Sequence, residues 1–157
     1  MSMETYVLSD RRLASVEAWQ EAIDLAGLPL RMSQATPFSE LQGALPVVLE
    51  RRPTAFECDH CDAKELMAEL SEVAFDRPWT FALAFRWGAD VYAGASAYAA
   101  AAAYALATDG VILDCEEAKL ISPERAIEIS RELAQSEALI HEAVRRVMEL
   151  DQNKSQT

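Results

Sequence analysis

The sequence AGASAYAAAAAYALA, residues 93–107, decides the fold. Ten of its fifteen residues are alanine, and no charged side chain occurs between Val91 and Thr108. The length approaches that of a membrane span, but alanine is only weakly lipophilic, and Asp90 and Asp109 adjoin the segment without a basic flank. We therefore predict a buried helix of a soluble domain, whose small side chains let its backbone approach a β-sheet closely.

Three tyrosines interrupt the alanines and are expected to supply the bulk that alanine lacks. Tyr92, Tyr98 and Tyr104 each then need a partner for the hydroxyl group or a route to water. The helix is predicted to end at Asp109 and Gly110, because glycine readily adopts the left-handed conformation that closes a helix.

The residues before this helix alternate between helix and strand patterns. A first helix is predicted from the caps Ser9 and Asp10 to Ala26, and a second from the capping box of Asp62 and Glu65 to Ala74. Apolar runs predict strands at residues 5–8, 28–32, 46–50, 54–58 and 79–87. The last run is rich in aromatic residues and is expected near the centre of the sheet.

After the alanine-rich helix, residues 111–114 and 119–121 are predicted to form a hairpin, and Ser122-Pro123-Glu124 opens a long helix towards Leu150. The element order predicts an α+β fold with an antiparallel or mixed sheet of ferredoxin-like type, whose first elements match a split βαβ unit. The alanine-rich helix, the hairpin and the long C-terminal helix are added to this unit and packed on the same sheet. Residues 1–150 form one domain, and the polar tail 151–157 is predicted to be disordered.

Overall charge and cysteine content indicate the kind of environment. The 157 residues are 51% hydrophobic and contain 26 acidic and 14 basic side chains, a net charge of -12. This charge repels phosphate backbones and anionic lipids, so nucleic-acid and membrane partners are not expected. The N-terminus lacks a secretory pattern, and an odd count of three cysteines suits a reducing compartment. We therefore expect a cytoplasmic protein.

The motif that most directly suggests a chemical function is Cys58-Asp59-His60-Cys61, between a predicted strand and a predicted helix. A thioredoxin-like redox pair occupies such a place, although the surrounding acidic residues oppose thiolate formation. Cys58, His60 and Cys61 also carry atoms that bind zinc, but a structural zinc site normally takes four ligands. A thiol-disulfide or metal-binding function is thus the alternative hypothesis; neither a bound metal nor a cofactor is predicted.

The acidic residues are concentrated in two segments. Residues 57–76 carry seven acidic residues and one basic residue, and residues 109–117 carry four acidic residues and no basic one, so these segments hold -10 of the total -12. They form either two separately solvated faces or one surface that captures a basic partner. Neither His60 nor His141 lies in a nucleophile motif, and no glycine-rich phosphate loop occurs, so no enzymatic activity is predicted.

The sequence ALATDGVILD at residues 105–114, followed by KLISPE at 119–124, leads from the alanine-rich helix into the hairpin. With its size, acidity and element order, the chain resembles the small acidic cytoplasmic immunity proteins that accompany bacterial polymorphic or contact-delivered toxins. The resemblance implies a role in bacterial competition, in which the protein binds a cognate toxin domain one to one without turnover. The toxin domain is expected to have a basic active-site cleft, and binding covers either that cleft or a remote site. The free protein is expected to be a monomer or small homo-oligomer. The residues expected to contact that partner are Glu57, Asp59, Asp62, Glu65, Asp109, Asp114, Glu116 and Glu117.

Overall fold

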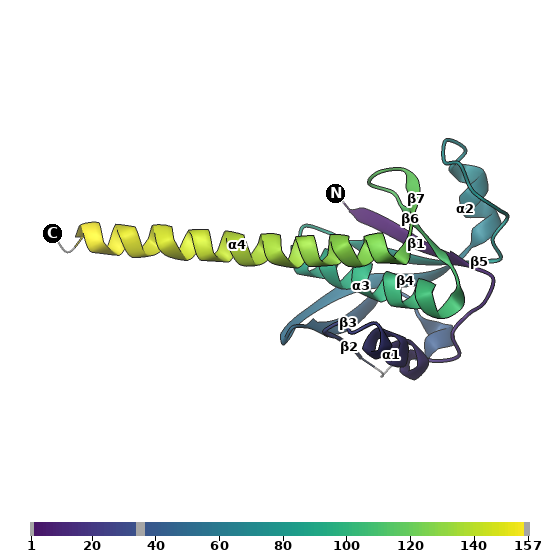
Figure 1. Cartoon of the computed structure of the whole chain (residues 1–157), viewed down its shortest axis with the longest axis horizontal. Coiled ribbons are helices and arrows are strands. Elements are labelled where there is room, and N and C mark those ends of the chain that lie inside the picture. The colour runs from purple at the N-terminus through teal and green to yellow at the C-terminus, as the bar shows by residue number, and fades with distance from the viewer. Residues whose placement is uncertain (1, 34–36, 156–157) are drawn as a thin grey trace.

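The computed structural model describes residues 2–33 and 37–155, the last three of them by their backbone only. The elements in chain order are β1 (Met3–Ser9), α1 (Val16–Leu25), β2 (Leu30–Met32), the short 3₁₀ helix η1 (Phe38–Glu40), β3 (Ala44–Leu49), β4 (Arg52–Asp62), α2 (Ala63–Glu69), β5 (Phe81–Trp87), α3 (Val91–Thr108), β6 (Val111–Asp114), β7 (Lys119–Ile121) and α4 (Pro123–Ser155) (Figure 1). The predicted α+β class is confirmed.

The strands form one sheet in the order β2-β3-β4-β5-β1-β6-β7, and neighbouring strands pair antiparallel. β5 lies at the centre, as its aromatic run predicts. Four antiparallel steps separate β1 from β2, so these two strands run in the same direction and α1 connects them as a crossover helix. This is a split βαβ unit in which β3, β4 and β5 lie between the two parallel strands.

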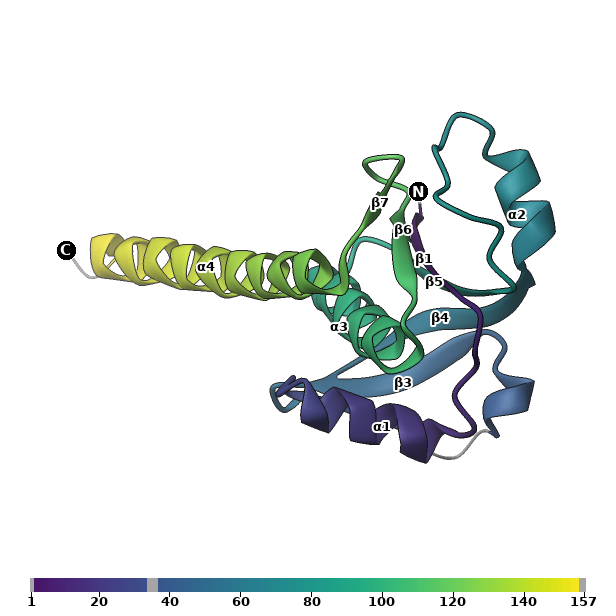
Figure 2. The ribbon, with the colours of Figure 1, turned by 45° about the vertical axis from the view of Figure 1, so that its right-hand side comes forward.

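Helix α3 lies at the centre of the main core, as the alanine-rich stretch predicts. It packs on one face of the sheet, with α1 beside it and the first half of α4 against it (Figure 2). The indole Nε1 of Trp19 donates to the carbonyl of Ala100 at 2.9 Å, and the hydroxyl of Ser130 donates to the carbonyl of Ala95 at 2.7 Å. Such contacts with the helix backbone require small side chains around it.

The three tyrosines of α3 have the partners that their burial requires. The Tyr98 hydroxyl donates to the Asp114 carboxylate at 3.0 Å, and the Tyr104 hydroxyl accepts from the backbone N–H of Leu13 at 3.3 Å. The Tyr92 ring packs under the Arg52 guanidinium, 4.3 Å from the ring centroid. The aromatic bulk of α3 thus links it to β6, to the segment before α1 and to β4.

The other face of the sheet is only partly covered. Helix α2 and the segment after it pack Leu66, Val73 and Trp79 against Tyr6 and Leu8 of β1, and this cluster covers the end of the sheet where β4 runs into α2. The opposite end of this face, where β4 passes Arg86 and β1 begins, has no helix on it in the described part of the chain. Polar side chains can therefore occupy that end.

Helix α4 differs from the prediction. Its first half packs on α3 instead of on the sheet, and its second half projects away from the other elements (Figures 1 and 2). Arg52 of β4 reaches Glu137 at 3.5 Å and His141 at 3.3 Å, and every side chain from residue 143 to 151 is exposed. The helix continues to Ser155, so residues 151–155 of the tail predicted to be disordered are helical, whereas 156–157 lie outside the described residues.

The predicted start of the first helix was wrong. Helix α1 begins at Val16, because the Ser15 side chain accepts the N–H of Ala18 at 3.0 Å and caps it. The expected caps have other partners: the Ser9 hydroxyl donates to the carbonyl of Arg11, and Asp10 accepts from Thr80. Because Ser9 and Asp10 are hydrogen-bonded to other residues, they do not cap the helix, and Ser15, the next residue suited to capping, starts it instead.

Three other element ends also differ. Glu50 and Arg51 both have positive φ and form a tight turn, so β4 begins at Arg52 and includes two of the three residues, 51–53, that were predicted to separate two strands. Asp62 caps α2 as predicted, but the helix already ends at Glu69. At the end of α3 the left-handed residue is Asp109, with φ 54°, instead of Gly110. Gly110 has a different role, since a Cβ there would lie 2.5 Å from the carbonyl oxygen of Leu8.

Candidate binding surface

The uncovered end of the second sheet face carries an ion cluster around Arg86 of β5. Its Nε lies 3.1 Å from Glu4 Oε1 on β1, and its Nη1 lies 3.4 Å from Asp59 Oδ2 on β4. The Tyr6 hydroxyl donates to Glu4 Oε2 at 3.0 Å, and Asp59 Oδ1 accepts the N–H of Gly43 at 3.0 Å. Burial, together with the charge of Glu4, raises the pKa of Tyr6 to about 12. Three neighbouring strands thus bring two carboxylates to one arginine.

Strand pairing adds Glu57 to this cluster. Glu57 is directly opposite Arg86 across the β4–β5 pair, and Arg86 is opposite Glu4 across the β5–β1 pair. Side chains alternate between the two faces of a strand. Glu57 therefore shares the face of Asp59, while Phe56 and Cys58, on either side of Glu57, point into the main core. The Glu57 side chain is exposed.

The turn between β6 and β7 lies beside the same cluster, because Asp114, the last residue of β6, pairs with Thr5, the neighbour of Glu4. Burial first, and then the charges of Glu4, Asp114 and Glu116, raise the pKa of the Cys115 thiol to about 11. Glu116 and Glu117 are exposed in this turn, and Lys119 pairs with Glu117 at 2.9 Å. We call the group Glu4, Glu57, Asp59, Glu116 and Glu117 the central acidic cluster.

The remaining predicted acidic residues lie elsewhere. Asp62 and Asp109 are at the opposite end of the strands: Asp62 pairs with Phe81, the first residue of β5, and Asp109 caps α3 and pairs with Arg11 at 2.8 Å. Five strand residues, about 17 Å, separate Asp62 from Glu57 along β4. Glu65 is exposed in α2. The eight predicted residues therefore do not form one continuous edge.

Asp114 is not a surface residue, contrary to its predicted role. Its side chain is buried with 2% exposure and accepts from the Tyr98 hydroxyl at 3.0 Å and from the N–H of Glu116 at 3.1 Å. Burial and this carboxylate raise the pKa of Tyr98. Asp114 thus holds β6 and its turn against α3.

The Cys58-x-x-Cys61 motif has a different setting from the predicted one. It lies inside strand β4 instead of between a strand and a helix. Cys58 is buried in the main core and Cys61 packs with the cluster on the other face, and three strand residues separate their Cα atoms by about 10 Å, beyond the reach of a disulfide. Burial raises the pKa of both thiols. This arrangement does not suit a redox pair.

A zinc site is equally unsupported by the geometry. His60 Nε2 is 3.0 Å from the carbonyl oxygen of Phe38, and Cys61 is on the face opposite to Cys58. Among the described residues, no three His, Cys, Asp or Glu side chains gather in a way that could hold a metal ion.

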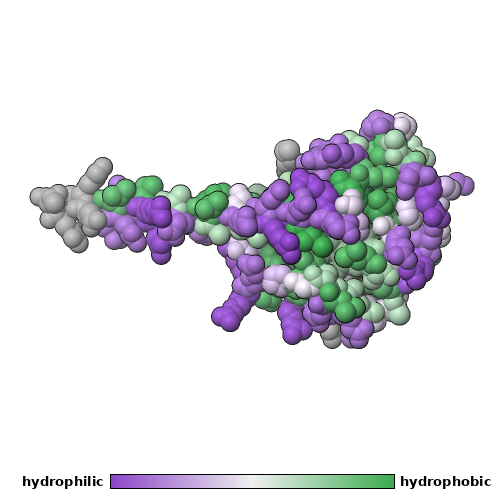
Figure 3. Space-filling model, viewed as in Figure 1, coloured by the Kyte–Doolittle hydropathy of each residue, from purple (hydrophilic) through white to green (hydrophobic). Residues whose placement is uncertain are grey.

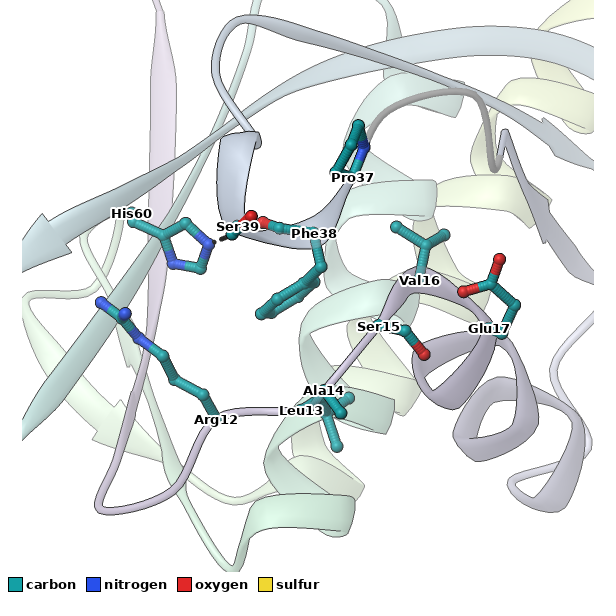
Figure 4. Close-up of a pocket in the computed structure, with 10 residues that line it drawn as sticks. All are labelled: Arg12, Leu13, Ala14, Ser15, Val16, Glu17, Pro37, Phe38, Ser39 and His60. Carbon is teal, nitrogen blue, oxygen red and sulfur yellow. Dashed lines mark hydrogen bonds between the residues drawn. The ribbon is translucent and has the colours of Figure 1, made fainter.

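A hollow of about 500 Å³ lies at the start of α1, beside η1 (Figure 4). Three of its polar residues already have partners within the protein: Ser15 caps α1, His60 contacts the Phe38 carbonyl, and the Arg12 guanidinium stacks over Phe81 at 4.4 Å from the ring centroid. Glu17 and Ser39 are the other polar residues of the hollow, which gathers fewer charged groups than the central acidic cluster.

The chain matches no family model, and no curated protein or solved structure is significantly similar to it. In the described part of the chain, no helix combines the length and the apolar character that a membrane span requires.

Sequence reasoning missed Glu4 and Arg86, which organise the surface. A signal was present, since Arg86 is the single charged residue in the otherwise apolar strand FALAFRW. A charge inside a central strand indicates that one face of the sheet is open to water at that point. What was missing was the pairing register that places Glu4 and Glu57 beside it.

Proposed function

We propose that the chain is a cytoplasmic immunity protein that neutralises a cognate toxin enzyme by one-to-one binding and catalyses no reaction itself. The observation that carries this proposal is the central acidic cluster, in which acids from β1, β4 and the β6–β7 turn gather on an uncovered sheet face.

The local charge favours a basic partner. The five carboxylates of the cluster have Arg86 and Lys119 as their cationic partners, which leaves a local charge of -3. Glu57, Glu116 and Glu117 are exposed and can meet cationic side chains of a second protein. Complementary charge of this kind accelerates association with a basic active-site cleft and fixes the orientation of the complex. The same charge disfavours nucleic acid and anionic membranes.

The test is a charge reversal on the surface with a matched control. Glu57→Lys, Glu116→Lys and Glu117→Lys combined should reduce the association rate with the cognate toxin domain, to be sought in the coding sequence next to this chain's, at least about 10-fold at low salt, within the range of electrostatic steering. The control combines Glu21→Lys, Glu40→Lys and Glu72→Lys, which makes the same change of net charge at exposed positions away from the cluster.

Association rates would be measured by surface-immobilised binding, and neutralisation by growth of cells that co-express both proteins. Circular dichroism would confirm that all variants fold. Full neutralisation by the cluster variant, or equal losses in both variants, would refute the assigned surface. Failure of the unmodified chain to bind the neighbouring toxin domain would refute the function.

A further inference from the structure

The projecting half of α4 exposes a row of large apolar side chains. Between residues 139 and 150, six of them are 52% to 70% exposed: Leu139, Ile140, Val144, Val147, Met148 and Leu150. We call residues 138–155 the arm. Large apolar side chains that gather on one exposed helix usually mark a contact with another protein surface.

The apolar residues of the arm share one side of the helix. At 100° per residue, the six side chains and Ala143 cover about half of its circumference, with Ile140 and Val147 near the middle. The opposite side carries ion pairs within the helix, in which Arg145 contacts Glu142 at 2.7 Å and Arg146 contacts it at 3.2 Å. In Figure 3 the arm accordingly shows hydrophobic atoms along one edge and hydrophilic atoms along the other.

This apolar side continues the stripe that packs inside the protein. Positions 126, 130, 133, 137, 140, 144 and 147 alternate spacings of four and three residues, the pattern of a helix with a partner helix along its whole length. Ala126 and Ser130 are buried against α3, and Leu133 packs on the same core. Beyond Glu137, α4 extends past the first turn of α3, and the stripe has no partner among the described residues.

Charge distinguishes the arm from the rest of the chain. Residues 138–155 contain Glu142, Glu149 and Asp151 against Arg145, Arg146 and Lys154, so their net charge is zero and the whole -12 lies outside the arm. A second copy of the chain can thus approach the arm without local repulsion, whereas two domains placed side by side would repel each other.

We propose that the arms of two copies pair antiparallel and form a homodimer with its two-fold axis between Val144 and Val147. This orientation holds the two acidic domains at opposite ends. It also brings Asp151 at the tip of one arm level with the β3–β4 turn of the partner, where Arg51 is exposed and makes no ion pair among the described residues. The exposed Arg51 at the base of one arm and Asp151 near the tip of the other can meet only in the antiparallel arrangement.

The buried area sets the expected strength of this dimer. Full burial of one such side chain removes on the order of 100 Å² of apolar surface, so six side chains exposed by about 60% contribute about 350 Å² per arm. A standard interface buries roughly 800 Å² per partner. We therefore expect a weak dimer that dissociates on dilution.

Sedimentation equilibrium of the full chain, over concentrations from about 1 to 200 μM, tests the dimer. Ile140→Glu with Val147→Glu should shift the protein to monomer and raise the dissociation constant at least about 100-fold. The matched control, Gln135→Glu with Ala138→Glu, adds the same charge on the opposite side of the helix and should leave the constant unchanged. A monomeric wild-type chain throughout this range, or a dimer that persists in the Ile140/Val147 variant, would overturn the proposal.

Cysteine cross-linking tests the orientation. In a background with Cys61→Ala and Cys115→Ala, chains with Ile140→Cys should form disulfides with chains carrying Asp151→Cys, and neither variant should cross-link to itself. Self-cross-linking at residue 140 would demonstrate parallel arms and overturn the antiparallel arrangement. The dimer does not depend on the proposed immunity function, because neither experiment requires a toxin.

Discussion

Removing the hydrogen bond between Tyr98 and Asp114 tests whether Asp114 is a structural residue or a partner-binding one, because only a structural role predicts a loss of stability. Asp114 is 2% exposed and has two donors, the Tyr98 hydroxyl at 3.0 Å and the N–H of Glu116 at 3.1 Å. A hydrogen bond to a charged group contributes about 1.5–3 kcal/mol to stability. Tyr98→Phe leaves the buried carboxylate with one donor, so we expect the free energy of unfolding to fall by about 2 kcal/mol.

A double-mutant cycle adds Asp114→Ala as the second single variant. This change leaves the Tyr98 hydroxyl and the Glu116 N–H without their acceptor and should reduce the free energy of unfolding by about 3 kcal/mol. The double variant should lose about 2 kcal/mol less than the sum of the single losses, because both remove the same bond. Tyr92→Phe is the control, since the Tyr92 hydroxyl makes no hydrogen bond among the described residues. It should change stability by less than about 0.5 kcal/mol.

Urea unfolding followed by tryptophan fluorescence measures the wild type and the four variants, with the three tryptophans as probes. Strictly additive losses in the double variant would show that the two side chains do not interact. An Asp114→Ala protein as stable as the wild type would refute the structural role and return Asp114 to the set of candidate partner contacts.

Three further predictions concern packing, thiol reactivity and acid stability. Gly94→Ala should reduce the free energy of unfolding by about 1–3 kcal/mol in a thermal or urea melt, because the added Cβ would lie 2.7 Å from Nε1 of the buried Trp87; an unchanged melt would show that the ring can move aside. Cys115, whose pKa is raised from 9.0 to about 11, should react with iodoacetamide at pH 8 about 100-fold more slowly in the folded chain than in the urea-unfolded chain. Peptide mass spectrometry of the alkylated protein gives both rates, and equal rates would contradict the burial of this thiol. The hydrogen bonds from Thr80 lower the pKa of Asp10 in the folded chain, so Asp10 stabilises the fold above its ordinary pKa of 3.8 and this contribution disappears as the pH falls through the lowered value. Asp10→Asn should accordingly be less stable than the wild type at pH 6, the difference should shrink towards pH 2, and a difference that is constant with pH would refute the assignment.

Local composition was sufficient to predict α3 and its place in the core. An uncharged helix with ten alanines in fifteen residues has no polar side to expose to water, so it is expected to be buried between other elements. The start of α1 could not be predicted in the same way. Ser9, Asp10 and Ser15 are all good helix caps. Which of them starts α1 depends on Thr80, seventy residues later in the chain, because Thr80 donates hydrogen bonds to the Asp10 carboxylate.

That acidic residues would gather on one surface was predictable from the sequence, but which residues would form it was not. The sequence shows that acids gather in residues 57–76 and 109–117, and the structure brings parts of both segments together at the central acidic cluster. The pairing register of the strands decides which residues of the two segments reach this cluster. Glu57 and Asp59 alternate with core residues of β4, whereas Asp114 ends β6 on the face towards α3, where Tyr98 binds it. One residue of shift along β6 would exchange these roles.

The alanine-rich helix also explains where the acids lie. Since α3 approaches the sheet closely and has α1 and α4 around it, helices cover one face of the sheet, and the charged side chains on that face, such as Asp114 and Arg52, have partners on α3. Helix α2 has seven residues, too few to cover the other face, so the sheet remains open beside Arg86. The acids of β1 and β4 and of the β6–β7 turn can only be solvated there. The proposed binding surface therefore depends on the early end of α2 at Glu69 as well as on its acidic side chains.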